Sequence, residues 1–223
     1  NAKVPGQLTG GEATAACELA AMGLREAAAG EIWAAAEGAG PWEPLALMRE
    51  ARGCGLTNVA AQLAVNLRIE TGVASHEAPR DLLRVSYPID YASTVVHEAR
   101  KAGIDPLFFA ALIRQESFWD PAAGSVAGAL GLTQVIPPTG EAIAASLGVS
   151  EFEASDLFRP AVSLEFGADY LGGQVKRYGD PLLALAAYNA GPCAASRWAA
   201  ELAQAPAELV EVVDFVETRT YVT

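Results

Sequence analysis

Apolar residues recur at three- and four-residue spacing through the first seventy or so positions, and each apolar run ends near a glycine. This spacing predicts amphipathic helices, and a glycine after the run suits the left-handed conformation that ends a helix. The predicted helices cover residues 12–22, 24–37, 42–52 and 56–71, and the glycines that end them are Gly23, Gly38, Gly55 and Gly72. We therefore expect two antiparallel helix pairs, as in a short piece of a helical-repeat array.

A passage with the character of a linker follows at residues 73–91, VASHEAPRDLLRVSYPIDY. Pro79 and Pro88 push the residues before them out of helical geometry and indicate a change of structural unit. We place the domain boundary near residue 86, which divides the chain into residues 1–86 and 87–223.

Proline and glycine also mark the helices predicted after Tyr91. Asp105 before Pro106, and Asp180 before Pro181, are each typical of an N-cap followed by the first helical position. The predicted helices cover residues 105–117, 138–147, 160–178, 180–189, 192–204 and 207–221. A convincing alternating strand pattern is absent, so the sequence predicts an all-α fold. Any sheet is confined to a small hairpin at residues 125–134, where Gly124, Gly128 and Gly131 loosen the backbone.

Composition narrows the class of protein. Hydrophobic residues make up 52% of the 223 and charged residues 19%, which predicts a globular chain. The net charge of −12 repels phosphate backbones and anionic headgroups, so we expect neither nucleic acid nor a membrane surface as a partner. The sequence holds no apolar run long enough to predict a membrane span. It opens with NAKVPGQLTGG, without Met or a leader pattern, so we expect a mature form or a fragment.

Cysteine and histidine give no sign of a metal site. Cys17, Cys54 and Cys193 lie far apart without a C-x-x-C pair, and the two histidines stand in unrelated contexts. We therefore expect no metal and no cofactor. The odd number of cysteines leaves at least one thiol free unless it pairs between molecules, and we interpret all three as small buried hydrophobic residues.

Glu116 is the carboxylate most suited to acid–base chemistry. It follows the apolar run LFFAALI near the end of a predicted helix. Burial and the negative end of the helix dipole both disfavour the charged carboxylate, so its pKa should rise. A carboxyl that stays protonated near neutral pH can act as a general acid on a glycosidic oxygen. The alternative is an ordinary solvated glutamate at a helix end.

A second catalytic carboxylate is harder to find. Asp120 precedes Pro121, where a turn-capping role is favoured, and Glu165 and Asp169 fall in the middle of a predicted helix, where we expect them to be solvated. Ordinary glycosidases use two carboxylates. The motifs offer no second candidate of this kind, and spacing alone does not establish whether the reaction uses one carboxylate or two.

Three motifs occur in a fixed order, IRQESFWDPAAGSVAGALGLTQVIPPT, then ALAAYNAGP, then DFVETRTYV. They resemble the ES, GLMQ and AYNAG motifs and the closing ETRxYV of the soluble-type (SLT) lytic transglycosylase catalytic domain. LLRVSYPIDY is similar to the lead-in to that domain in the large soluble members. The resemblance covers roughly residues 80–222, and the earlier residues more loosely resemble the helical superhelix and linker that precede the domain.

The resemblance implies a lysozyme-like all-α fold and cleavage of the β-1,4 bond between N-acetylmuramic acid and N-acetylglucosamine in peptidoglycan glycan strands. Glu116 stands at the position of the family's catalytic glutamate. In the family that residue protonates the glycosidic oxygen and then helps the 6-hydroxyl of muramic acid attack its own anomeric carbon, leaving a 1,6-anhydro sugar. The substrate implies a location in the periplasm or on the exterior of the cell envelope.

The same resemblance implies five substrate contacts, each of which has a structural alternative. These residues are Ser125, Gln134, Tyr188, Asn189 and Glu217. Ser125 could instead bond to backbone, Gln134 could satisfy a loop, and Tyr188 could serve the core, although its phenol can do both. Glu217 could form an interhelix ion pair in which Arg219 neutralises it.

Departures from the family pattern affect the details of binding. Thr133 and Ile136 stand where methionines are common, so we expect different hydrophobic contacts with the bound sugar, and Ser163 replaces a common Asn. Among the aromatic residues we favour the core over a sugar groove for Trp119, Trp198, Tyr170 and Tyr178. The competing functions are a lysozyme-like muramidase that uses water and a non-catalytic peptidoglycan-binding module.

Overall fold

The chain forms two compact units, Asn1–Pro88 and Ile89–Thr223. The computed structural model describes residues 14–37, 40, 43–204 and 208–222. Within these ranges the regular elements are all helical, and the extended backbone amounts to isolated bridges at Gly124–Leu130 and Leu130–Val135. The predicted all-α fold is confirmed, and the predicted hairpin is reduced to these two bridges.

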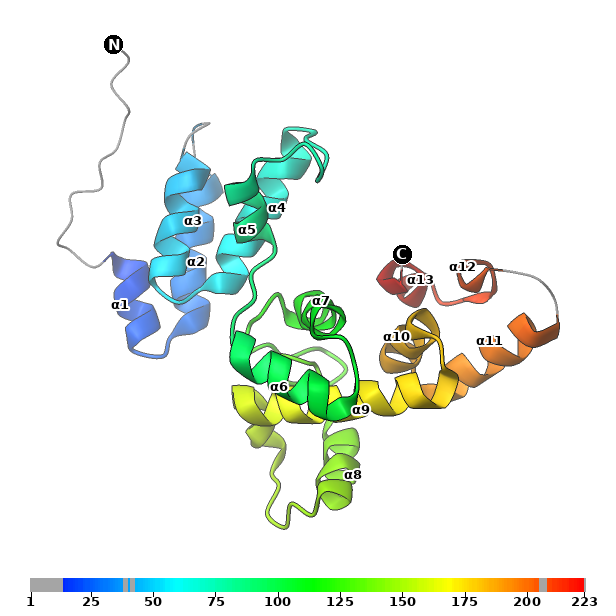
Figure 1. The fold of residues 1–223 in the computed structure, drawn as a ribbon. Coiled ribbons are helices and arrows are strands. Elements are labelled where there is room, and N and C mark those ends of the chain that lie inside the picture. The colour runs from blue at the N-terminus through cyan, green and yellow to red at the C-terminus, as the bar shows by residue number, and fades with distance from the viewer. Residues whose placement is uncertain (1–13, 38–39, 41–42, 205–207, 223) are drawn as a thin grey trace. The chain divides into compact units, whose positions relative to one another are not determined.

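The first unit begins with two packed helix pairs, as the glycine-punctuated pattern predicts. Its helices are α1 (Ala15–Ala21), α2 (Arg25–Glu37), α3 (Glu43–Gly53) and α4 (Thr57–Glu70) (Figure 1). Gly23, Gly55 and Gly72 have the expected positive φ values, 81°, 73° and 67°. Gly38 and the predicted helix start at residue 12 lie outside the described residues. The buried core of this unit is formed by Ala28, Ile32, Met48, Leu56, Val59 and Leu63, among others.

A disulfide bond links the two helix pairs. Cys17 on α1 is bonded to Cys54, just after α3, with the two Cα atoms 4.6 Å apart. Cys193 is a free and exposed thiol. The interpretation of all three as buried hydrophobic residues is therefore wrong, because pairing depends on a tertiary contact that spacing along the chain does not reveal.

The segment expected to be a linker contains a helix, α5 (Arg80–Ser86). Pro79 occupies the N-cap position, so it precedes the first helical residue rather than interrupting a helix. Leu82 and Val85 of α5 pack against the core of the first unit. This helix consequently belongs to the first unit, which extends to Pro88.

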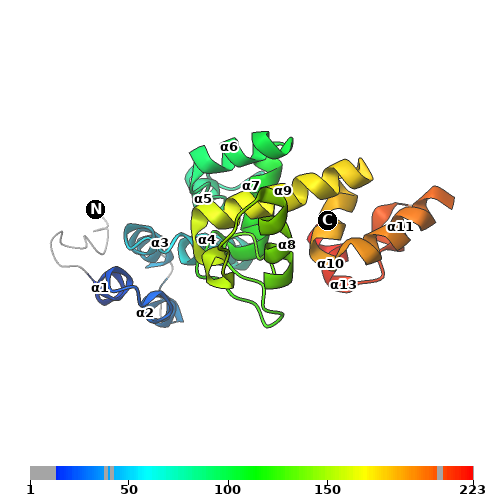
Figure 2. The same cartoon turned by 90° about the horizontal axis from the view of Figure 1, so that it is seen from below.

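The second unit is organised around α9 (Pro160–Tyr178), the longest helix described (Figures 1 and 2). α6 (Ala92–Ala102) and α8 (Pro137–Leu147) pack against α9, and α7 (Pro106–Ser117) packs against α6. The core between them includes Val95, Phe109, Ile113, Leu164 and Leu171. The helices predicted from residues 105, 138 and 160 are confirmed, whereas α6 was not predicted.

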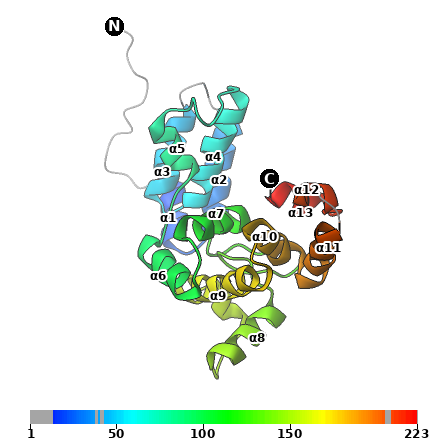
Figure 3. The same ribbon diagram turned by 45° about the vertical axis from the view of Figure 1, so that its right-hand side comes forward.

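The helices that follow α9 along the chain lie together on one side of the second unit (Figure 3). They are α10 (Pro181–Ala190), α11 (Pro192–Gln204), α12 (Leu209–Val212) and α13 (Val216–Val222), and a short 3-10 helix, η1 (Ala154–Phe158), precedes α9. α10 packs against α9, α11 and α13, around buried Trp198, Leu183 and Val213.

The helix predicted at residues 207–221 is two short helices, and its start at residue 207 lies outside the described residues. The chain leaves helical geometry at residues 213–215. There the carboxylate of Asp214 accepts hydrogen bonds from Arg197 (2.7 and 2.9 Å) and from the indole of Trp198 (3.0 Å) on α11. The Arg219 guanidinium donates to the carbonyl of Val213 at 2.6 and 3.1 Å. These hydrogen bonds satisfy the Asp214 carboxylate and the Val213 carbonyl, so the chain can leave helical geometry between α12 and α13.

Aspartate caps fix the starts of the two helices that deliver the candidate site. Asp105 Oδ1 accepts from the amides of Leu107 (2.7 Å) and Phe108 (3.1 Å) at the start of α7. Asp180 Oδ1 accepts from the amide of Leu183 (2.8 Å) at the start of α10. Both predicted N-caps are confirmed. α7 thus presents Glu116 in its last turn, and α10 presents Tyr188 and Asn189 in its own.

The described helices include none with the length and apolar character required to cross a membrane.

Candidate active site

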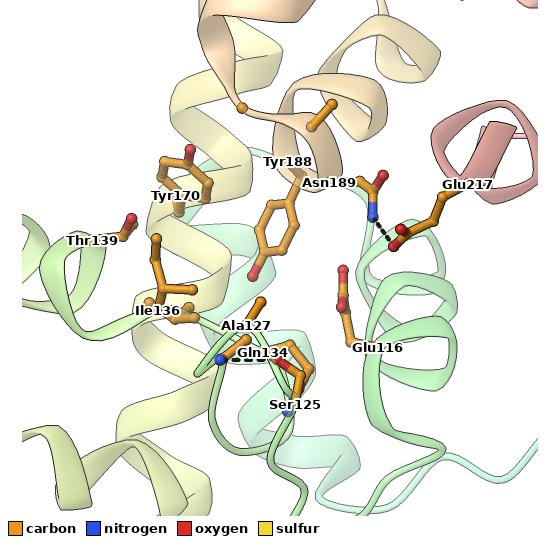
Figure 4. A pocket seen from close by; sticks show the side chains of 14 residues that line it. Glu116, Ser125, Ala127, Gln134, Ile136, Thr139, Tyr170, Tyr188, Asn189 and Glu217 are labelled. Carbon is orange, nitrogen blue, oxygen red and sulfur yellow. Dashed lines mark hydrogen bonds between the residues drawn. The ribbon is translucent and has the colours of Figure 1, made fainter. Parts of the chain in front are cut away.

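A cavity of about 430 Å3 in the second unit brings together all six site residues expected from the sequence. Glu116, Tyr188 and Glu217 reach it from α7, α10 and α13, and Ser125 and Gln134 reach it from the segment between α7 and α8 (Figure 4). Asn189 follows Tyr188 in α10. Residues separated by up to about one hundred positions therefore line one space, and their individual roles stay predictions.

Ser125 lies in a tight turn at the edge of the cavity. Its amide donates to the carbonyl of Ala129 at 2.9 Å, and its hydroxyl oxygen accepts from the Ala129 amide at 3.0 Å. Gly128 closes the turn with φ of 81°. The backbone role considered for Ser125 is thus present, and its own O–H is left to donate to a ligand.

Gln134 holds the same segment together through its amide group. Its Nε2 donates to the carbonyls of Gly131 (2.9 Å) and Ala123 (3.2 Å), and its φ of 49° lies in the left-handed region. The loop-satisfying role considered from the sequence is therefore present for the nitrogen, while the amide oxygen is available as an acceptor.

Thr133 is fully buried and does not line the cavity. Its hydroxyl donates to the carbonyl of Ser163 at 2.8 Å, and the two hydroxyls lie 3.0 Å apart. The expectation that hydrophobic contact with the sugar differs here stays a prediction, and Thr133 itself supplies no surface to the cavity. Ile136, the other departure from the methionine pattern, does line the cavity.

Glu116 has the raised pKa that the sequence predicts. Burial of the carboxyl is the largest cause and raises its pKa, the Tyr221 hydroxyl opposes this by donating to Glu116 Oε1 at 2.5 Å, and the charge of Glu217 raises it further. The resulting pKa is about 7. At neutral pH the carboxyl is thus present in both protonation states, as a group that both donates and accepts a proton requires.

Glu217 lies beside Glu116 in the cavity lining and is held by its neighbours (Figure 4). The Asn189 Nδ2 donates to Glu217 Oε1 at 3.4 Å, and the Thr218 hydroxyl donates to Asn189 Oδ1 at 2.6 Å. These bonds fix α13 to the end of α10. Glu217, expected from the closing motif as a substrate contact, is thus a second carboxylate in the cavity lining, and its role stays a prediction.

Tyr188 combines a core role with a place in the cavity. Its hydroxyl donates to the carbonyl of Thr133 at 2.7 Å, and its ring lies edge-on to Tyr170 with the centroids 5.2 Å apart. Burial and the charge of Glu116 raise the pKa of Tyr188 well above its usual value, so the phenol stays protonated. The core role considered for this residue is thus present, and its contact with substrate stays a prediction.

Comparison with known proteins identifies the family. The model of the Transglycosylase SLT domain matches residues 93–210, which cover the cavity-lining parts of α7 and α10 and the segment between α7 and α8. The chain belongs to this family.

Two curated relatives and two solved structures illustrate the match. The chain is 31% identical over 146 residues to the soluble lytic murein transglycosylase of Salmonella typhimurium, covering 64% of this chain and 23% of that protein. It is 32% identical over 145 residues to a putative soluble lytic murein transglycosylase of Haemophilus influenzae, covering 64% and 24%. The chain thus matches about a quarter of the length of these relatives.

The solved structures are similar over most of this chain. An inactive mutant of the lytic transglycosylase Slt from Pseudomonas aeruginosa gives a TM-score of 0.77 at 28% identity, covering 93% of this chain and 32% of that one. A 70-kDa soluble lytic transglycosylase in complex with bulgecin A gives 0.83 at 25% identity, covering 100% and 35%. The lysozyme-like SLT fold expected from the motifs is confirmed.

Sequence reasoning about this SLT domain missed two residues at the site, Tyr221 bonded to Glu116 and Tyr170 in the cavity lining. Tyr221 was quoted within the closing motif but given no role, and only the fold shows that its hydroxyl reaches Glu116, 105 residues away. Tyr170 was assigned to the core, yet it lines the cavity. Trp119 and Trp198 are buried as expected.

The other carboxylates considered from the sequence have structural roles. Asp120 Oδ1 accepts from the amide of Ala122 at 3.0 Å, which confirms the turn role. Glu165 binds Lys101 at 2.6 Å, and Asp169 is exposed. Across the described part of the SLT domain and the first unit, His, Cys, Asp and Glu side chains form no cluster suited to a metal ion.

Proposed function

We propose that this chain carries the catalytic domain of a peptidoglycan lytic transglycosylase in residues 87–223, preceded by a helical segment in residues 1–86. The observation that carries the proposal is Glu116, a carboxyl with a pKa of about 7 in a cavity that also holds Glu217. Membership of the SLT family and the names of the murein-acting relatives support the same substrate, the glycan strands of peptidoglycan.

The cavity suits a two-step use of Glu116. In the first step the protonated carboxyl donates its proton to the oxygen of the β-1,4 bond as that bond breaks. In the second step the resulting carboxylate accepts the proton of the muramic acid 6-hydroxyl as its oxygen bonds to the anomeric carbon. The products are a free 4-hydroxyl and a 1,6-anhydro end, and no water is consumed.

The remaining groups bind the sugar and stabilise charge. The carboxylate of Glu217, which lies beside Glu116 in the cavity lining, favours the positive charge that develops at the anomeric carbon. The Ser125 hydroxyl can donate a hydrogen bond to the substrate. The Gln134 amide oxygen can accept one from it. Asn189 acts mainly by holding Glu217 in place.

We further propose that the protein works in the periplasm or on the exterior of the cell envelope. Its substrate lies there, and the bond between Cys17 and Cys54 favours an oxidising compartment.

Mass spectrometry of fragments released from purified peptidoglycan tests the function. We expect fragments with 1,6-anhydromuramic acid ends from the wild type and none from the Glu116→Gln variant, which keeps the shape of the side chain but cannot exchange the proton. Glu141→Gln, the same substitution at an exposed position on α8, should leave the products unchanged.

Two other results would contradict the proposal. Reducing-end products, heavier by one water, would make the enzyme a hydrolase and give Glu217 the role of the second carboxylate. Binding of glycan without release of fragments would identify a binding module.

A further inference from the structure

Thr133 and Ser163 form a buried polar pair between the cavity loop and α9. Both residues are 0% exposed. The Thr133 amide donates to Ser163 Oγ at 3.2 Å, and the Thr133 hydroxyl donates to the Ser163 carbonyl at 2.8 Å. α9 approaches closely here, since a Cβ atom built on Gly167 would lie 2.5 Å from the side chain of Thr133. The pair is thus enclosed, with its hydrogen bonds protected from water.

The backbone carbonyl of Thr133 decides what Tyr188 can offer to the cavity. That carbonyl accepts the only proton of the Tyr188 hydroxyl, at 2.7 Å. The phenol oxygen then has only lone pairs left for other partners. A different direction of the carbonyl would release the proton and turn Tyr188 into a donor toward the cavity.

The direction of this carbonyl is held in a strained peptide unit. Gln134, which shares the peptide with Thr133, has φ of 49°, a region that residues with a Cβ seldom adopt. Such a conformation persists where surrounding bonds determine it. Here Thr133 donates hydrogen bonds to Ser163 on one side, and the Gln134 side-chain amide donates to the carbonyls of Gly131 and Ala123 on the other.

We propose that Thr133 and Ser163 are a positioning pair that fixes the Thr133 carbonyl, so that Tyr188 presents a hydrogen-bond acceptor to the saccharide. The inference rests on the proposed function for the identity of the ligand. The Tyr188 oxygen then accepts a hydrogen bond from a donor on the saccharide, either a sugar hydroxyl or an acetamido N–H. Thr133 and Ser163 act through Tyr188 and do not touch the substrate.

Proton NMR of the Tyr188 hydroxyl tests the first link without any need for activity. We expect a hydroxyl proton that exchanges slowly with water in the wild type and at least about tenfold faster in Thr133→Val, which keeps the shape of the side chain but removes its hydroxyl. Thr133→Ser, which keeps the hydroxyl, should restore slow exchange. Equal exchange in the wild type and Thr133→Val would overturn the inference. Ser163→Ala provides the same test should Thr133→Val fail to fold.

A double-mutant cycle with Tyr188→Phe tests the second link. We expect Thr133→Val to lower kcat/KM on peptidoglycan glycan about five- to tenfold in the wild type, and less than about twofold in the Tyr188→Phe background. Equal losses in both backgrounds would show a merely structural role and refute the proposal. Ser86→Ala, which removes a buried hydroxyl bonded to the Leu82 carbonyl in the first unit, should leave kcat/KM unchanged. A wild type that lacks activity would count against the proposed function, and the NMR result would still decide the positioning pair.

Discussion

The proton affinity of Glu116 is set by three identifiable influences at the residue scale. Burial raises its pKa, the Glu217 charge acts in the same direction, and the hydrogen bond from Tyr221 opposes both. The balance leaves the pKa at about 7, where one group can serve as acid and base in successive steps. The influences of Tyr221 and Glu217 each come from one side chain, so each of these two can be removed alone.

The Glu116→Gln variant should be more stable than the wild type at alkaline pH. The folded pKa of about 7 lies above the ordinary value of 4.5, so the native state binds more protons between these values and wild-type stability falls as the pH rises through this range. Glutamine removes this loss. We expect a gain of about 1–2 kcal/mol at pH 8 and none at pH 4, measured by denaturant unfolding. Equal stability at pH 8 would show that the carboxylate is not disfavoured in the fold, and Glu141→Gln should show no pH-dependent difference.

Tyr221→Phe should move the alkaline limb of the pH profile of kcat/KM to higher pH. The substitution removes the hydrogen bond that stabilises the ionised carboxylate of Glu116, so the pKa of Glu116 rises and the acid form persists further. We also expect kcat to fall about three- to tenfold, because the carboxyl loses its orientation. An alkaline limb at the wild-type pH would show that Tyr221 does not influence the titration of Glu116.

Glu217→Gln should move the same limb in the opposite direction. The negative charge of Glu217 raises the pKa of Glu116, and a neutral amide lowers it again. We expect kcat to fall about tenfold or more, because a charge that favours the transition state is lost. The pH profiles of kcat/KM for the two variants, measured side by side, check the direction of each shift. Alkaline limbs that move in the same direction in Glu217→Gln and Tyr221→Phe would contradict this account.

At the scale of elements, α9 contains a matched pair of glycines with opposite expected responses. A Cβ on Gly167 would meet Thr133 at 2.5 Å, whereas a Cβ on exposed Gly173 would meet nothing within 4 Å. We expect Gly167→Ala to destabilise the protein by about 1–3 kcal/mol and Gly173→Ala to stabilise it by about 0.5–1 kcal/mol. Thermal unfolding measures both. Equal effects of the two substitutions would mean that α9 does not approach the cavity loop as closely as described.

The sequence predicts helix boundaries correctly where a residue at the boundary itself determines them. Asp105 and Asp180 cap their helices as expected, and α9 spans the predicted residues 160–178 because proline and glycine mark both ends. The break between α12 and α13 was missed because Asp214 bonds to α11, a contact between elements. α5 was missed because a proline that precedes a helix and one that breaks a helix look alike in sequence.

At the scale of the whole molecule, reduction of the Cys17–Cys54 bond should weaken the first unit and leave the SLT domain unaffected. The bond closes a loop between positions 37 apart, for which the loss of the cross-link costs about 2–4 kcal/mol. We expect a reducing agent to lower hydrogen-exchange protection in α1–α4 and to leave α7, α9 and α10 unchanged. Cys193→Ser should have no effect on either unit. Loss of protection across the SLT domain would contradict the assignment of the bond to the first unit alone.

The candidate site could be predicted as a set of residues but not as an arrangement. Motifs supplied Glu116, Ser125, Gln134, Tyr188, Asn189 and Glu217, all of which line the cavity. The hydrogen bonds between these side chains and their neighbours depend on chain segments that come together only in the folded protein. The bond from Tyr188 to Thr133, for example, joins residues 55 positions apart.

The hydrogen bond between Tyr221 and Glu116 also orders events during synthesis. It joins residues 105 positions apart, so a nascent chain must lengthen by that much after Glu116 is made before the donor exists. Until then α7 can form from its own local signals, but its glutamate lacks both the Tyr221 hydroxyl and the Glu217 charge. A growing polypeptide can therefore form the helix that carries Glu116 before it contains the two groups that tune the pKa of this residue.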